Sequence, residues 1–304
     1  MQTKNKILVP IDFDEQSIIA LKYAEHFAEL TNAELEVITV VEESGIFSKL
    51  FSTDELAVKI NKEIQQKLDE AVLPYKSKIN INTQIVYGKP YEKILEIASK
   101  INPSFIFMGR SEMPKYKKAF VGSNAMHMIL ESIFPVITIN GNNDFELYKK
   151  ENKEILVPLD FEKETSEQLT SAIELAQVLK SGLRLITIQT SGGKAEEASL
   201  LSKLAVYKKF ISEKGIICDI EIINKGNAEI ADIINNQAIK NKSELIIIMT
   251  RQESQILGYF MGSTATDIIN KSEIPVLTMK PWDNEEGSKV FSSFYDPLSL
   301  YKKK

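Results

Sequence analysis

The chain has 304 residues, 43% of them apolar and 26% charged, with a formal net charge of −5. A chain of this length has room for two globular domains, each large enough to bury its own core. Both halves carry more acidic than basic residues, so neither has the basic excess that nucleic-acid binding requires.

The first half alternates short apolar runs with amphipathic stretches. Asp14 is expected to cap a helix that runs to about Leu30, and Ser52 to Glu55 is a capping-box pattern that opens another helix. Further helices are predicted at 90–100 and from Gly122-Ser123. Strands are predicted at 7–11, 35–41, 79–87, 105–108 and 136–139.

The second half repeats the first. KILVPIDFDEQS at 6–17 returns as EILVPLDFEKETS at 154–166, and FVGSNA at 120–125 returns as FMGSTA at 260–265. A repeat this long indicates a duplicated domain, because solenoid repeats are roughly 20–50 residues long. Strands are predicted near 155–159, 183–189, 216–223, 245–249 and 276–279.

These patterns predict an α/β fold. Continuous apolar strands such as 245–248 indicate burial on both faces, and helices between the strands indicate parallel crossovers. We therefore expect two tandem open parallel five-stranded α/β/α sandwiches, at 1–141 and 151–281. Residues 282–304 have a polar composition with interspersed aromatic residues, and they are interpreted as a C-terminal tail outside both cores.

Several kinds of site are excluded by their missing motifs. The chain has no P-loop and no Gly-rich turn after its first strand, which excludes P-loop and dinucleotide fingerprints. His26 and His127 lack metal-ligand spacing, and no catalytic group can be named. We predict that the protein has no metal site of its own and is not an efficient enzyme. The weakest alternative is that it is a slow ATPase.

The remaining candidates gather where ligands bind in open parallel sheets, beyond the carboxyl ends of the strands. Pro10-Ile11-Asp12 and Pro158-Leu159-Asp160 end the first strand of each copy. Met108-Gly109-Arg110 ends the fourth strand, and Gly122-Ser123 opens a helix whose free N–H groups suit a phosphate.

These motifs resemble the universal stress protein family, over nearly the whole chain and in two copies. The family pattern is Val-Pro-x-Asp, then Gly-x2-Gly-x9-Gly-Ser/Thr, then Pro-Val-Leu/Ile. The resemblance implies an adenine nucleotide alpha hydrolase-like fold with strand order 3-2-1-4-5 and a site for ATP or AMP, with magnesium only alongside nucleotide. It implies these binding residues: Pro10, Ile11, Asp12, Val40, Met108, Gly109, Arg110, Glu112, Gly122, Ser123, Asn124, Ala125, Asp160, Gly262, Ser263 and Thr264.

The copies depart from the family pattern in the Gly-rich segment. In the first, Glu112 stands where the second glycine belongs. In the second, Thr250 is aligned with the opening glycine and Glu253 with the second, leaving eight residues before Gly262. A carboxylate about 5 Å from a phosphate costs about 3 kcal/mol at a dielectric near 20. Nucleotide binding is expected mainly in the first copy, because only that copy keeps the opening glycine and the nine-residue spacing.

Each candidate also has a purely structural interpretation. Asp12 and Asp160 would cap a helix or bond loop amides, Gly109 would serve a turn, and Gly122-Ser123 would be a plain helix start. On that interpretation the chain is an interaction module with vestigial pockets that binds a protein or an apolar metabolite. The leading hypothesis remains a nucleotide-binding stress-response regulator.

Partners and location follow from the remaining features. The last strands, 136–139 and 276–279, are apolar edges expected to pair as an intramolecular pseudo-dimer, and a homodimer is an alternative. No run of roughly 18–20 apolar residues suggests a membrane span, and the first residues lack a signal-peptide core. The single cysteine, Cys218, is expected in a strand core and fits a cytoplasmic location.

Overall fold

The computed structural model describes residues 5–42, 54–110, 123–140, 153–161, 165–190, 192–250 and 261–280. The chain divides into two compact units, Met1–Gly141 and Asn142–Lys304. They are called domain 1 and domain 2, and each is described by itself.

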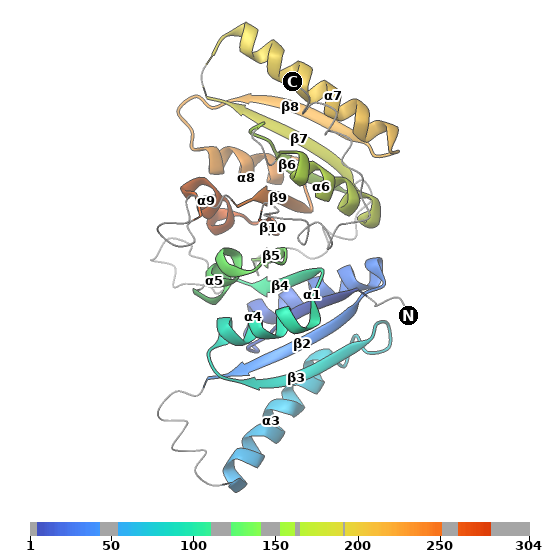
Figure 1. Ribbon diagram of the computed structural model, residues 1–304, viewed down its shortest axis with the longest axis vertical. Coiled ribbons are helices and arrows are strands. Elements are labelled where there is room, and N and C mark those ends of the chain that lie inside the picture. Colours follow the sequence, from blue (N-terminus) through green and yellow to red (C-terminus); the bar gives the residue numbers. More distant parts are fainter. Residues whose placement is uncertain are drawn as a thin grey trace. The chain divides into compact units, whose positions relative to one another are not determined.

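Domain 1 is an open sheet of parallel strands in the order β3-β2-β1-β4-β5, as predicted (Figure 1). Helices cover the sheet, and α4 and α5 pack against each other. The elements are β1 (Lys6–Pro10), α1 (Glu15–Thr31), β2 (Glu34–Val41), α3 (Asp54–Val72), β3 (Ile81–Tyr87), α4 (Pro90–Ile101), β4 (Phe105–Gly109), α5 (Ser123–Glu131) and β5 (Val136–Ile139).

Domain 2 repeats this topology as β8-β7-β6-β9-β10, again with parallel pairing. Its β8 begins at Cys218, two positions later than the predicted start at 216. The elements are β6 (Glu154–Pro158), α6 (Thr165–Leu179), β7 (Gly182–Gln189), α7 (Lys194–Glu213), β8 (Cys218–Asn224), α8 (Ile230–Lys240), β9 (Leu245–Met249), α9 (Ser263–Lys271) and β10 (Val276–Met279).

Two local predictions are confirmed. Asp14 caps α1, since its carboxylate accepts a 2.7 Å hydrogen bond from the Ser17 amide. Cys218 is a core residue with 4% of its surface exposed, and burial raises the pKa of its thiol to about 11. A thiol with so high a pKa is a weak nucleophile at neutral pH.

The central strands of each sheet are paired only near their amino ends. In domain 1 the β1–β4 register covers Ile7↔Phe105 and Leu8↔Ile106. In domain 2 it covers Ile155↔Leu245 and Leu156↔Ile246. Beyond these pairs the strands diverge, which is the place where open α/β sheets bind ligands.

In domain 2 a side chain closes this divergence. Gln168 of α6 is 5% exposed, and its amide nitrogen donates to the carbonyl oxygens of Pro158 (3.0 Å) and Ile247 (2.9 Å). These two bonds thus join the end of β6 to the middle of β9. The corresponding residue of domain 1 is Ala20, which has no side-chain donor.

One carboxyl group of domain 2 is buried at a cost. The Oε1 atom of Glu174, on α6, is buried without a hydrogen-bond partner among the described residues. Burial raises the pKa of Glu174 from 4.5 to about 8. The folded domain therefore holds a proton that the unfolded chain releases between these two pH values, and stability falls as pH rises through this window.

Replacing Glu174 with Gln should remove this pH dependence. The quantity to compare is the melting temperature of Glu174→Gln minus that of wild type. We expect this difference to be roughly 2–5 °C larger at pH 9 than at pH 5. Thermal unfolding followed by circular dichroism at both pH values measures the difference. If the melting temperatures of the variant and wild type differed by the same amount at both pH values, Glu174 would be ionised in the folded protein.

Candidate functional site

The turn after β1 is fixed by hydrogen bonds on both sides. The Ile11 amide donates to Ile38 O (2.8 Å), and Thr39 Oγ1 donates to Ile11 O (2.6 Å). The Asp12 carboxylate accepts from the Asp14 amide at 3.2 Å. Asp12 therefore bonds a loop amide, as the structural interpretation expected, while its side chain stays exposed at the carboxyl edge.

Asp14 adds a second carboxyl group to this turn. Burial, and to a smaller extent the neighbouring Asp12, raises the pKa of Asp14, although the hydrogen bond from the Ser17 amide acts in the opposite direction. The turn thus presents two carboxyl groups within three residues of each other. An electropositive group facing it would be favoured.

The same turn recurs in domain 2. The Leu159 amide donates to Ile186 O (2.8 Å), and Thr187 Oγ1 donates to Leu159 O (3.0 Å). Asp160 is again exposed at the end of its strand. The first candidate segment therefore has the same backbone in both copies.

An aromatic residue in a strained conformation follows each aspartate. Phe13 has φ +66° and Phe161 has φ +59°, a region that bulky residues rarely adopt. The Lys67 ammonium lies 5.9 Å from the Phe13 ring centre, and the Lys203 ammonium 5.0 Å from that of Phe161. In domain 2, Tyr207 also stacks on Phe161 at 6.1 Å. No sequence pattern indicates these residues, because their signal is backbone geometry.

Gly109 ends β4 where the first turn of α1 passes. A β-carbon at this position would lie 2.5 Å from the Gln16 carbonyl and 2.7 Å from the Ser17 amide nitrogen. The glycine is therefore required by packing between strand and helix, whatever else it contacts. Met108, the residue before it, is buried in the core.

The sheet register corrects the alignment of the second copy. Gly109 pairs with Ile139 and Met249 pairs with Met279, so Met249, and not Thr250, occupies the position of Gly109. The equivalent of Arg110 is Thr250, since their amides donate to Ile139 O and Met279 O, each at 2.8 Å. Counting on from Met249 puts Gln252 in the place of Glu112, with nine residues before Gly262. The predicted eight-residue spacing and the paired glutamates were wrong.

The carboxyl edges of the two sheets differ in charge, because domain 1 has Arg110 where domain 2 has Thr250. Arg110 is 7% exposed, and burial lowers the pKa of its guanidinium to about 10, so it remains a cation at neutral pH. Thr250 is neutral, and its hydroxyl donates to Met279 O at 3.2 Å.

The other predicted residues lie around the same edge or beyond the described part. Pro10 and Val40 are half-buried at the ends of β1 and β2, and Ile11 is buried. In α5, Asn124 is half-buried and Ala125 buried, whereas Ser263 and Thr264 are exposed in the first turn of α9. Gly262 is the N-cap residue of α9 and, as a glycine, has no side chain that could bond to the start of the helix. Glu112, Gly122 and the side chain of Ser123 lie outside what the structure describes.

Comparison with known proteins places the chain in a family. The model of the universal stress protein family matches residues 4–140 and again 151–280. A universal stress protein of Methanocaldococcus jannaschii is 28% identical over 155 residues, covering 45% of this chain and 96% of the relative. The crystal structure of a universal stress protein from Archaeoglobus fulgidus covers 93% of this chain and 100% of its own, with a TM-score of 0.74 and 22% identity.

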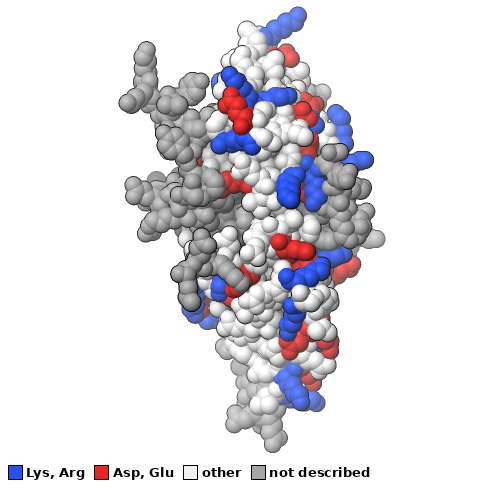
Figure 2. All heavy atoms as spheres, turned by 90° about the vertical axis from the view of Figure 1, so that its right-hand side faces the viewer, with Lys and Arg blue, Asp and Glu red and all other residues white. Residues whose placement is uncertain are grey.

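The fold defines an α/β protein with an open parallel sheet in each of two tandem domains. The chain belongs to the universal stress protein family, and each of its halves is a family domain. Across the residues that the structure describes, every helix is too short or too polar to cross a membrane. On the face drawn in Figure 2, basic and acidic side chains are interspersed.

The packing role of Gly109 can be tested against a second glycine. Gly109→Ala should destabilise the protein by about 1–3 kcal/mol, because the new methyl group meets the backbone of α1. Gly262→Ala is the matched control, since a β-carbon there meets nothing within 4 Å among the described residues. Urea unfolding of both variants measures the difference, and equal stabilities would contradict this role.

Proposed function

We propose that domain 1 binds an adenine nucleotide, ATP or AMP, at the carboxyl edge of its sheet, and that the protein acts as a ligand-binding regulator without efficient catalysis. The observation that supports this proposal most strongly is Arg110. It places a buried cation at the end of β4, beside the divergence of β1 and β4.

A guanidinium at this edge suits an anionic ligand, because arginine binds phosphate oxygens through two parallel hydrogen bonds. The nearby start of α5 supplies backbone N–H groups at Ser123 that also favour an anion. On this proposal the phosphates lie between Arg110 and α5, and the nucleoside lies toward Pro10, Asp12 and Val40.

Domain 2 supports a different role for the second copy. At the positions of Ala20, Gly109 and Arg110 it has Gln168, Met249 and Thr250, which close the strand divergence and remove the cation. We infer that domain 2 binds nucleotide weakly at most and serves as an interaction module. The site of domain 2 is then vestigial, and it includes Asp160, Gly262, Ser263 and Thr264.

The assembly and location are also proposals. Pairing of Val136–Ile139 with Val276–Met279 would give an intramolecular pseudo-dimer, and it stays a prediction. A magnesium ion is proposed only together with nucleotide. The cytoplasmic location rests on the sequence features alone.

Replacing Arg110 with the residue of domain 2 tests the proposal. Arg110→Thr should weaken ATP binding about tenfold to a hundredfold, because a charge-assisted hydrogen bond is lost, and should weaken adenosine binding much less. Thr250→Val is the matched control and should leave both affinities unchanged. Isothermal titration calorimetry, with a melting curve of each variant, measures these effects. Equal ATP affinity of Arg110→Thr and wild type would contradict the site.

A glutamate at each helix start tests the asymmetry between the domains. Gly122→Glu introduces a carboxylate where the phosphates of domain 1 are proposed, and should reduce ATP affinity about a hundredfold. Gly262→Glu makes the same change in domain 2 and should reduce the affinity less than twofold. The same titrations measure both variants. A similar loss in both would mean that the two domains share nucleotide binding.

A further inference from the structure

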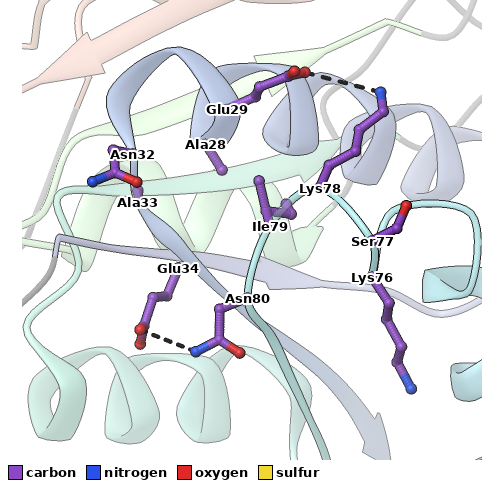
Figure 3. A pocket seen from close by; sticks show the side chains of 10 residues that line it. All are labelled: Ala28, Glu29, Asn32, Ala33, Glu34, Lys76, Ser77, Lys78, Ile79 and Asn80. Atoms are coloured by element: carbon purple, nitrogen blue, oxygen red, sulfur yellow. Dashed lines mark hydrogen bonds and ion pairs between the residues drawn. The ribbon is translucent and has the colours of Figure 1, made fainter.

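Each domain has a cavity at the amino-terminal edge of its sheet, which is the edge opposite to the carboxyl edge of the same sheet. In domain 1 it measures about 310 Å³ and lies between the end of α1, the start of β2 and residues 76–80 (Figure 3). In domain 2 it measures about 640 Å³ and lies between the end of α6, the start of β7 and residues 214–219. The two cavities occupy the same place in the fold.

The polar side chains of the domain 1 cavity bond to one another or to their neighbours. Figure 3 shows Glu34 meeting Asn80, whose amide donates to it at 3.0 Å. Lys78 reaches Glu25 at 3.2 Å and Glu29 at 3.9 Å. These pairs leave little bonding capacity for a ligand.

Domain 2 replaces the Glu34–Asn80 pair with a glycine and an isoleucine, and it has lysines at two other positions of the cavity. The strand register puts Gly182 at the position of Glu34, and the preceding loop puts Ile217 at that of Asn80. Lys180 follows α6 in the left-handed conformation with φ +55°, as Asn32 follows α1 with φ +51°. The same loop alignment puts Lys214 at the position of Ser77. A polar pair has thus become an open, apolar wall beside two cations.

The carboxylates of this cavity are already engaged. Arg184 donates to Glu154 at 2.8 Å and to Asp219 at 3.1 Å. Lys153, a third lysine that lines the cavity, lies 3.7 Å from Glu244, which is not part of the lining. Lys180 has no carboxylate within ion-pair distance among the described residues. Lys214 lies over the Phe210 ring at 4.8 Å, which leaves its ammonium able to donate hydrogen bonds.

The apolar wall lies next to these cations. Ile217 is 77% exposed, an unusual exposure for a large aliphatic residue that lines a cavity, and the side of the cavity includes Leu183 and Ile216. The volume falls within the range of small-molecule sites. An occupant must therefore combine an apolar body with a negative charge.

We propose that this cavity of domain 2 binds a small organic anion, a carboxylate or phosphate monoester attached to an apolar body. The charged group lies between Lys180 and Lys214, and the apolar body covers Ile217. This site lies at the amino-terminal edge of the domain 2 sheet, whereas nucleotide binding is proposed at the carboxyl edge of the domain 1 sheet, and neither proposal depends on the other.

The experiment uses the full chain with octanoate, octyl phosphate and, as the uncharged control, 1-octanol. Calorimetry measures affinity, and amide chemical shifts locate the site. We expect one or both anions to bind with shifts at 176–183 and 214–219, and 1-octanol to bind at least tenfold more weakly. The anion that binds more tightly identifies the preferred head group.

The variants restore the residues of domain 1. Lys180→Asn and Ile217→Asn should each weaken anion binding about fivefold to tenfold, through lost charge and lost apolar contact respectively. Lys180→Asn keeps a residue that tolerates the left-handed conformation, so the fold is preserved. Lys76→Asn, at the rim of the domain 1 cavity, is the matched control and should change nothing. Absence of anion binding to wild type, equal binding of 1-octanol, or unchanged affinity in both variants would overturn the proposal.

Discussion

The site of each domain depends on the divergence of its two central strands. In a parallel sheet with order 3-2-1-4-5 the chain leaves the first strand in one direction and the fourth in the other, so no crossover covers the gap between them. Here the pairing stops after Leu8↔Ile106 in domain 1 and after Leu156↔Ile246 in domain 2. The backbone groups beyond these pairs need other partners. What supplies them determines whether a ligand can enter.

The two domains differ at this edge. In domain 1, Gly109 allows the backbone of α1 to come close to β4, and Arg110 adds a buried cation. In domain 2, the amide of Gln168 bonds the carbonyl groups of Pro158 and Ile247 directly, beyond the last paired residues of β6 and β9. A polar side chain with two bonds at about 3 Å is a stable replacement for a ligand, because the buried carbonyl groups are satisfied permanently. The closed edge of domain 2 thus follows from hydrogen-bond satisfaction.

Most of the fold could be predicted from the sequence, whereas the site could be predicted only in part. Apolar runs such as 245–248 and the cap at Asp14 are local signals, and both elements formed where expected. Aligning Thr250 with Gly109 failed because the copies have little identity after this strand, and only the register of β9 with β10 fixed the correspondence. The burial of Arg110 and the conformation of Phe13 depend on residues distant in sequence, so no local pattern indicates them.

The residues at the amino-terminal edge support the proposal that the domain 2 cavity has a ligand of its own. Where domain 1 has the Glu34–Asn80 pair, domain 2 has Gly182 and Ile217, and Ile217 exposes 77% of its surface. Such exposure gives the isolated domain no stability, because burial is what makes an aliphatic side chain favourable. A surface isoleucine beside two cations is better explained by contact with something that covers it.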